Sequence, residues 1–411
     1  MARYRFLGGA EEIGSLGLVL EDRRTRVLID YGLSPDSPPG FPEQAPDVDA
    51  VLLTHAHLDH SGCLPEIAMR ADTPIHTTET SRRVSGILHQ DTLKIADLEG
   101  HAVPFNAAAV ERLKGLYRDI TPDDPFQVGD LDVTPVSAGH IPGAVQFLVE
   151  GDRRTLFTGD LFTQPTRLVQ AARPEKAEVL FIETTYAGRT HPSRSDEETR
   201  LVAKVDEVVE RGGLALIAAF ATGRTQEVLL ALTMESDHDI WVDGMGARVL
   251  QVFLDTPEAV ADPRALERVR ERVRIVRNHR QRRHAMATGG VIVATSGMLE
   301  GGPILHYLSQ QRGRQKDALL LTGYQVHGTN GRRVLDDRFY TDRGVRHTVD
   351  LEVDRFDLST HLGHDDIVDY VRRSGCDDVV LYHGYDREAL VPELSPFARV
   401  HLPKRGETIE L

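Results

Sequence analysis

Short apolar runs, separated by glycine and charged turn residues, dominate the first 190 residues of the chain. Their length and their alternating or fully apolar pattern are typical of β-strands in a buried sheet. We expect strands over residues 3–7, 16–20, 26–29, 51–54, 74–77, 131–136, 145–150, 155–158 and 179–182, and helices over 64–70 and from 80 onward. The proline-rich segment 34–46 is expected to be a loop.

From about residue 188 the pattern changes to fully apolar strands that alternate with helices. Helices are expected over 195–211, 224–234 and 304–311, and strands over 214–219, 240–243, 291–295 and 318–322. Such alternation is typical of a parallel sheet that is covered on both faces. Near residue 353 the sequence returns to the pattern of the first 190 residues. We expect a helix over 365–373 and a strand over 379–382. We therefore predict an α/β protein in which residues 1–188 and 354–411 form one domain and residues 189–353 are inserted in it.

Composition and charge narrow the class of protein. With 411 residues, 40% of them hydrophobic, the chain is long enough for two globular domains. It contains no apolar run of the roughly 20 residues that a membrane helix needs, and its first residues lead directly into a strand, so neither membrane insertion nor export is expected. Two cysteines, Cys63 and Cys376, cannot build a disulfide framework, which favours a reducing cytoplasm.

The segment His55-Ala56-His57-Leu58-Asp59-His60 has the highest density of metal-capable side chains in the sequence. In extended backbone, residues two apart point the same way, so His55 and His57 can bind one ion. Where the chain then turns, Asp59 and His60 can reach a second ion. Imidazole and carboxylate together favour zinc or a similar metal such as manganese. A polar loop with incidental histidines is the alternative, and it is disfavoured because ligands this dense are rare without a metal.

Further polar residues follow strands elsewhere in the chain: Asp30, His140, Asp160, Glu183, His361 and His383. Together with the histidine-rich segment, Asp30, His140 and Asp160 resemble the signature of the metallo-β-lactamase fold. Glu183 in Glu-Thr-Thr-Tyr, His361 in Ser-Thr-His and His383 in His-Gly resemble the additional motifs of the β-CASP nucleases. The chain is most similar to the compact bacterial and archaeal relatives of the cleavage and polyadenylation specificity factor nuclease, and RNase J resembles it more distantly. The resemblance implies an αββα metallo-β-lactamase sandwich with an inserted parallel-sheet α/β β-CASP domain.

The resemblance also implies a site for two Zn²⁺ ions, with Mn²⁺ as a substitute. Its ligands would be His55, His57 and His140 for one ion, Asp59, His60 and His383 for the other, and Asp160 for both. Asp30 would orient a ligand histidine. Two ions about 3.5–4 Å apart can share a hydroxide that attacks phosphorus in line. His361 would then protonate the departing oxygen with Glu183 as its partner, and Asp59 would belong to the same catalytic group.

Residues of the predicted inserted domain are candidates for RNA contact. Arg224 opens a helix after a strand, where it could bind phosphate or could pair with a nearby glutamate. Ser296 and Gly297 follow a strand and could present backbone amides to phosphate. The net charge of −15 argues against nucleic-acid binding by the whole surface, but nine arginines lie in the stretch 264–283. That stretch either lines an access channel for RNA between the domains or is a solvated helix face balanced by acids.

These features predict a zinc-dependent ribonuclease that cleaves single-stranded RNA in processing or decay, as an endonuclease, a 5′-exonuclease or both. We expect a cytoplasmic enzyme, and the resemblance allows a homodimer. A DNA nuclease of the same family is the first alternative, and His383 argues against it because DNA-directed relatives tend to carry valine there. A small-molecule metallo-hydrolase would not need the inserted domain. A non-catalytic RNA-binding subunit would be expected to lack ligands, and all seven are present.

Overall fold

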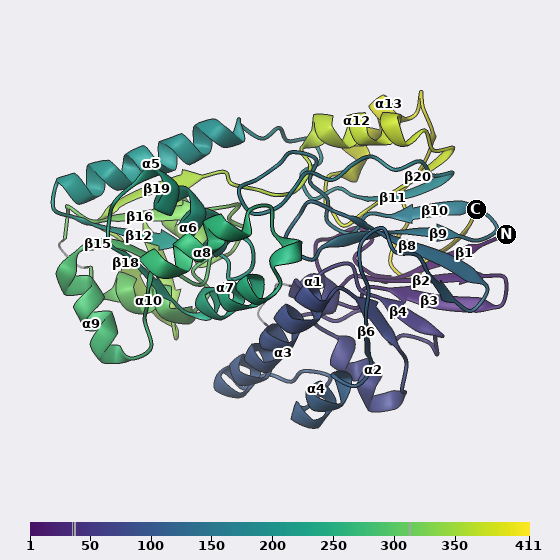
Figure 1. The fold of residues 1–411 in the computed structure, drawn as a ribbon, viewed down its shortest axis with the longest axis horizontal. Helices are drawn as coiled ribbons and strands as arrows, with labels where there is room; N and C mark the ends of the chain where they lie inside the picture. The colour runs from purple at the N-terminus through teal and green to yellow at the C-terminus, as the bar shows by residue number, and fades with distance from the viewer. Residues whose placement is uncertain (35, 37, 312–313) are drawn as a thin grey trace. The chain divides into compact units, whose positions relative to one another are not determined.

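The computed structural model describes residues 1–411 except 35, 37, 312 and 313, and its chain forms two compact units (Figure 1). Unit 1 consists of Met1–Pro165, Gln170–Thr190 and Thr360–Leu411, and unit 2 consists of Thr166–Val169 and His191–Ser359. Unit 2 thus runs six residues beyond the predicted insertion of residues 189–353 and also takes in a short separate segment. The strands and helices predicted from the sequence are present, each with bounds within two residues of those expected.

Unit 1 is built on two seven-stranded sheets. The strands of the first are β1 (Arg3–Gly8), β2 (Gly17–Asp22), β3 (Thr25–Ile29), β4 (Ala50–Leu52), β5 (Ile75–Thr77), β6 (Tyr117–Asp119) and β22 (Thr408–Glu410). Those of the second are β7 (Phe126–Val128), β8 (Leu131–Ser137), β9 (Val145–Glu150), β10 (Arg154–Phe157), β11 (Val179–Glu183), β20 (Asp378–Tyr382) and β21 (Arg399–His401). Their orders are β22-β1-β2-β3-β4-β5-β6 and β21-β20-β11-β10-β9-β8-β7. The C-terminal segment therefore supplies strands to both sheets.

Aromatic side chains fill the space between these two sheets. The ring of Tyr4 on β1 lies 4.8 Å from that of Phe181 on β11, and Phe6 lies 6.0 Å from Tyr382 on β20. All four side chains are buried in one apolar cluster with residues from both sheets. Burial of rings of this size contributes strongly to folding, because each removes a large apolar area from water.

Helices cover the outer faces of both sheets (Figure 1). On the first sheet these are α1 (Leu58–Ser61), α2 (Leu64–Arg70), α3 (Glu79–Glu99) and α4 (Ala107–Leu113), and on the second α12 (His364–Ser374) and α13 (Val391–Leu394). Val51 of β4 shares a buried cluster with Ile67 of α2, and Leu180 of β11 shares another with Ile367 of α12. The order helix, sheet, sheet, helix is the αββα sandwich that the resemblance implied.

Unit 2 contains a parallel sheet, as the alternating pattern predicted. Its strands are β12 (Leu214–Ala218), β13 (Ile240–Asp243), β14 (Arg274–Ile275), β15 (Gly290–Ala294), β16 (Ala318–Thr322) and β19 (Glu352–Phe356), in the order β14-β13-β15-β12-β16-β19. All pairs are parallel. Every residue of the central strand β12 is buried, because α5 (Arg194–Glu210) and α10 (Gly302–Ser309) both pack against it.

The remaining elements of unit 2 are short helices and one hairpin. They are α6 (Arg224–Glu235), α7 (Met245–Asp255), the 3-10 helix η1 (Pro257–Ala259), α8 (Pro263–Arg272), α9 (His279–Thr288), α11 (Asn330–Asp337) and the hairpin β17 (Phe339–Asp342) with β18 (Val345–Thr348). Within the described part of the chain, none of the helices combines the length and apolar character needed to cross a bilayer.

Candidate active site

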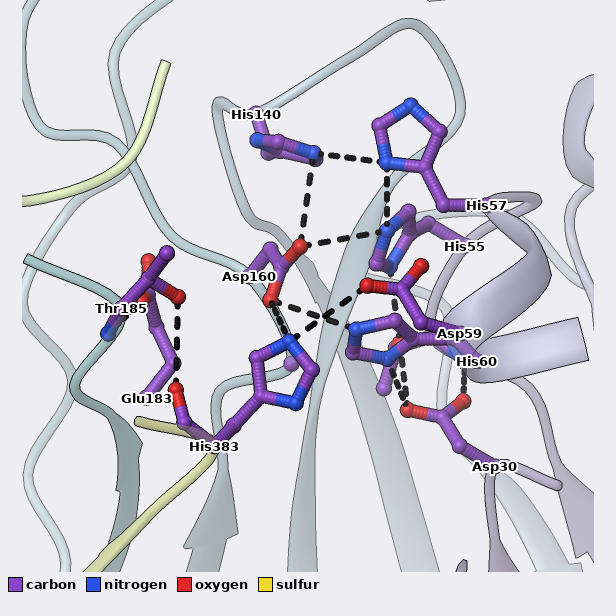
Figure 2. A network of polar contacts seen from close by, with 12 residues as sticks. Asp30, His55, His57, Asp59, His60, His140, Asp160, Glu183, Thr185 and His383 are labelled. Atoms are coloured by element: carbon purple, nitrogen blue, oxygen red, sulfur yellow. Dashed lines mark hydrogen bonds and ion pairs between the residues drawn. The ribbon is translucent and has the colours of Figure 1, made fainter. Parts of the chain in front are cut away.

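The metal-capable residues predicted from the sequence are brought together at strand ends of unit 1 (Figure 2). His55 and His57 follow β4, and Asp59 and His60 lie in α1, which begins directly after them. The others come from segments after β3, β8, β10 and β20, namely Asp30, His140, Asp160 and His383. Residues separated by more than 300 positions in the sequence therefore converge on one site.

A close backbone contact fixes the helix that carries Asp59 and His60. The N–H of Tyr31 donates a 2.7 Å hydrogen bond to the carbonyl of His60. A Cβ atom on the neighbouring Gly32 would lie 1.7 Å from the Asp59 carbonyl oxygen, so only glycine allows this approach. The segment after β3 thus sets the position of α1.

Three imidazoles and one carboxylate form the first group. Nδ1 of His57 lies 3.1 Å from Nε2 of His55 and 3.1 Å from Nε2 of His140. Oδ2 of Asp160 lies 3.5 Å from His55 Nε2 and 3.6 Å from His140 Nε2. One ligand atom from each of the four residues lies within 4.8 Å of the others, a spacing that one metal ion could bridge.

The other oxygen of Asp160 faces a second group. Its Oδ1 atom lies 3.3 Å from Nε2 of His60 and 3.8 Å from Nε2 of His383. Oδ2 of Asp59 lies 3.6 Å from the same nitrogen of His383. Asp160 therefore directs one carboxylate oxygen to each group, which is the arrangement expected of a ligand shared by two ions.

Hydrogen bonds at the outer nitrogens fix the ring orientation of two histidines. Nδ1 of His140 lies 2.7 Å from the carbonyl oxygen of Thr360, which only accepts, so Nδ1 carries the proton. Nδ1 of His60 likewise donates to Oδ2 of Asp30 at 2.7 Å. Both rings therefore present Nε2 to Asp160. Histidine ligands of metals characteristically donate their second N–H to a carboxylate or carbonyl in this way.

The inner atoms lack the partners that buried polar groups normally have. Among the described residues, His60 Nε2, Asp160 Oδ1 and both ring nitrogens of His383 are buried without a hydrogen bond. Polar atoms left unpaired in a protein interior are unfavourable. A cation among them would satisfy these lone pairs, so the donor set fits a metal.

Electrostatics act in opposite directions on different histidines of the site. Burial lowers the pKa of His55 and of His140 well below the usual value, which favours the neutral form that binds metals. Burial acts on His60 in the same direction, but the carboxylates of Asp160 and Asp30 outweigh it and raise its pKa. Burial would raise the pKa of Asp160, yet the positive charge of His60 lowers it, so this carboxylate is ionised.

His361 and Glu183 form a pair beside Asp160. Nδ1 of His361 lies 3.0 Å from Oε1 of Glu183 and 3.9 Å from Oδ2 of Asp160. Burial lowers the pKa of His361, but the carboxylates of Glu183 and Asp160 outweigh it and raise it to about 9. Glu183 is fully buried and also accepts a hydrogen bond from the N–H of Thr185, which orients its carboxylate. The histidine is thus charged at neutral pH, while its side chain keeps 19% exposure.

The residues predicted to contact RNA share one edge of the sheet of unit 2. Arg224 is the first residue of α6, after β12, whereas Ser296 and Gly297 follow β15. β12 and β15 are parallel neighbours, so their carboxyl ends lie side by side. In open α/β sheets this edge is where ligands commonly bind.

The arginine-rich stretch is partly neutralised. Three arginines pair with aspartates near β13: Arg272 with Asp237, Arg274 with Asp239 and Arg282 with Asp243. On and beside α9, Arg277, Arg280 and Arg283 are exposed. The stretch therefore combines structural arginines with a basic surface.

Three supporting residues were not singled out in the sequence. The N–H and Oγ1 of Thr54 donate to Asp30 at 2.7 and 2.8 Å, and the Thr360 carbonyl orients His140. His89 of α3 is fully buried and donates from Nε2 to the carbonyl of Ser61, 2.8 Å away, at the end of α1. Thr54 and Thr360 adjoin recognisable motifs, but a lone histidine within a helix gives no comparable signal.

Comparison with known proteins agrees with the fold. Residues 12–207 match the metallo-beta-lactamase superfamily and residues 225–334 match the Beta-Casp domain. The chain is 33% identical over 426 residues to "Probable RNase MJ4" of Methanocaldococcus jannaschii, with 99% of each chain covered. It is 31% identical over 422 residues to "RNase aCSPSF2" of Saccharolobus solfataricus, with 99% of this chain and 85% of that protein covered.

A solved structure shares the fold over its whole length. It is a protein of unknown function from Enterococcus faecalis, with a TM-score of 0.63 at 16% identity and complete coverage of both chains. Fold and site together define a metal-dependent hydrolase of the metallo-β-lactamase superfamily. Within it, the chain belongs to the β-CASP family of ribonucleases.

Proposed function

We propose that the protein is a zinc-dependent ribonuclease that hydrolyses phosphodiester bonds of single-stranded RNA. The observation that carries this proposal is the position of Asp160. One of its oxygens faces each histidine group, and the charged His361 lies beside it. A paired metal site next to a proton donor suits a phosphodiester, in which negative charge develops on phosphorus oxygens and on the leaving group. The ribonuclease names of two relatives support RNA as the substrate.

Seven residues would hold two ions: His55, His57 and His140 one, Asp59, His60 and His383 the other, and Asp160 both. Four imidazole and carboxylate donor residues for each ion, without cysteine, favour Zn²⁺, with Mn²⁺ as a substitute. When bound, the metals would supply a water activated at neutral pH and positive charge against the phosphate. Asp30 would hold the ring of His60 in its ligand orientation.

Proton transfer would fall to the residues beside the metals. His361 would donate a proton to the departing ribose oxygen, and Glu183 would keep it charged and correctly oriented. Asp59, whose side chain is 24% exposed, would serve both as a ligand and as an acceptor of a hydrogen bond from the attacking water.

RNA phosphates would be bound along the carboxyl edge of the sheet in unit 2. Arg224, Ser296 and Gly297 would contact the backbone there, and the exposed arginines of α9 would add salt-dependent affinity. Arg224→Gln should weaken the binding of oligonucleotides of different sequence alike and reduce the salt dependence by about one phosphate contact. Binding measured at several salt concentrations would test this, and unchanged binding would remove Arg224 from the proposed surface.

A time course on RNA labelled at the 5′ or 3′ end tests the proposed function. The zinc-loaded parent should cleave, and His57→Ala should not, while keeping its fold. His238→Ala is the matched control, because His238 pairs with Asp206 in unit 2 and is not among the proposed ligands. Internal fragments indicate endonuclease action, and early release of 5′-terminal nucleotides indicates exonuclease action. A fully active His57→Ala would refute the metal mechanism, and equal cleavage of the corresponding DNA would favour the DNA nuclease.

A further inference from the structure

A network of two buried glutamates and two partly buried arginines joins separate segments within unit 2. Its members are Arg167 in the short segment Thr166–Val169, Arg194 and Glu198 on α5, and Glu227 on α6. Two guanidinium groups thus face two carboxylates. The network uses none of the residues assigned above to metal binding, proton transfer or RNA contact.

Arg194 lies at the centre of this network, and its side chain is only 10% exposed. Its Nε donates to Glu198 at 2.8 Å, and its Nη2 lies 3.1 Å from Glu227. Its Nη1 donates to two backbone carbonyl oxygens, those of Leu358 at 2.8 Å and Ser359 at 3.2 Å. One side chain therefore connects two helices to two consecutive peptide groups.

The short segment Thr166–Val169 joins the same network. Nε of Arg167 donates to Glu198 at 2.6 Å, and the N–H of Leu168 donates to Glu227 at 3.3 Å. Burial would raise the pKa of Glu198, but the hydrogen bonds from Arg167 and Arg194 outweigh it and lower the pKa. Glu198 thus accepts from two arginine side chains, and Glu227 accepts from a backbone N–H and pairs with Arg194.

A contribution to protein stability does not by itself explain why these four charged residues lie together. Removing four charges from water is costly, and well-packed apolar side chains of similar size would often stabilise a protein as much or more. Apolar side chains cannot form directional hydrogen bonds to particular peptide groups, whereas these charged side chains can. The network therefore favours a role in holding defined backbone positions.

The held peptide groups belong to the segment that bears His361. Between the end of β19 at Phe356 and the start of α12 at His364, this segment has no continuous backbone ladder to fix it. The carbonyls bound by Arg194 lie two and three residues before His361. Further support comes from Glu197 on α5, which accepts the N–H of Asp357 at 2.7 Å. One face of α5 thus fixes the start of the segment.

Chain connectivity links the network to two more site residues. Thr166 follows Asp160 by six residues, and Arg194 follows Glu183 by eleven. Asp160, Glu183 and His361 themselves converge in unit 1. The network thus connects three segments of the chain, which follow Asp160, follow Glu183 and precede His361.

We propose that Arg194 is a positioning residue, which fixes the backbone before His361 through the carbonyls of Leu358 and Ser359. The catalytic part of this inference rests on the ribonuclease function proposed above. Arg194 contacts no proposed metal ligand, so its loss should leave metal binding unchanged and reduce the turnover that depends on His361.

The test compares Arg194→Met and Arg194→Lys with Lys204→Met. Lys204 lies on the same helix and pairs with Glu207 and Glu352, and it does not contact Glu197 or the carbonyls of residues 358 and 359. Hydrogen–deuterium exchange should accelerate in peptides covering residues 357–363 of Arg194→Met and not of Lys204→Met. With RNA, Arg194→Met should lose about 10²-fold in kcat with little change in KM, as expected for a displaced catalytic group. Arg194→Lys, which keeps the charge and one donor group, should fall between.

The outcomes separate this inference from the proposed function. Unchanged exchange at residues 357–363 in both Arg194 variants would overturn it, as would equal effects in Lys204→Met. Zinc binding is measured in parallel, and a loss of affinity in the Arg194 variants would also contradict it. If Arg194→Met does not fold, Arg194→Lys decides alone. If the parent cleaves no RNA, the proposed function fails, while the exchange comparison still shows whether Arg194 holds this segment.

Discussion

Replacing Asp30 by asparagine is the most direct test of how the protein prepares a ligand histidine. Asp30 is fully buried and accepts three hydrogen bonds, from the N–H and Oγ1 of Thr54 and from Nδ1 of His60. Its backbone has a φ of 56°, a left-handed conformation that asparagine tolerates well. Asp30→Asn therefore keeps the size and backbone of the residue and removes its charge.

The expected effect follows from the bonds that the amide cannot make. Asparagine has one acceptor oxygen, so its amide nitrogen must face either the N–H of Thr54 or the N–H of His60. A hydrogen bond to a charged group contributes about 1.5–3 kcal/mol. With about 1.4 kcal/mol for each factor of ten, its loss should weaken zinc binding by about 10- to 100-fold.

Competition with a chromophoric chelator at neutral pH measures this affinity, and thermal unfolding without metal shows whether the variant is folded. Asp22→Asn is a suitable control, because Asp22 is also buried in unit 1 but accepts from the N–H of Asp152, away from the site. If folded Asp30→Asn binds zinc as tightly as the parent, the carboxylate does not prepare His60, and the reasoning is wrong.

Three further predictions concern other parts of unit 1. Gly32→Ala should displace α1 and reduce RNA cleavage about 10²-fold in a kinetic assay, whereas Gly86→Ala, with open space at its Cβ, should not. His361→Ala should retain the metal in elemental analysis and lose most turnover; parental turnover would exclude it as the proton donor. Arg399, Arg153 and His401 outweigh burial and lower the pKa of Asp378 to about 2. Its stabilisation is therefore present above the unfolded-state pKa and is lost as pH falls towards 2. Asp378→Asn should lower the free energy of unfolding by about 2 kcal/mol at pH 7 in urea titrations, and by less near pH 3; a pH-independent difference would contradict this.

The apolar pattern predicts the central elements well because their burial is nearly complete. Val145–Glu150 and Ala318–Thr322 are mostly apolar strands in sheet interiors, and both have the expected bounds. Elements with little apolar signal were missed. β19 carries three charged residues in five because it is the edge strand of its sheet, and α9 buries only Ala285. Tertiary contacts, rather than local pattern, determine such elements.

For the candidate site, the clustered residues could be predicted from the sequence, but the contacts that orient them could not. His55, His57, Asp59 and His60 lie within six residues, and local geometry alone suggests that they share metals. The contacts that orient them join distant residues, 30 apart for Asp30 with His60 and 220 apart for His140 with Thr360. In the sequence, Arg194 is one of several polar residues at the start of a helix. Only the folded structure shows that it binds the carbonyl groups of Leu358 and Ser359. Periodicity and motif spacing contain no information on such pairs.

The late position of His383 has a consequence for the order in which the protein is made. During synthesis, β11 leaves the ribosome long before β20, which pairs with it along its whole length. Until then the second sheet has an open edge, and Asp59 and His60 lack their third partner. The ribosome must complete all of unit 2 before His383 emerges. A translation product that stops within unit 2 thus lacks His383, the residue that completes the group formed with Asp59 and His60.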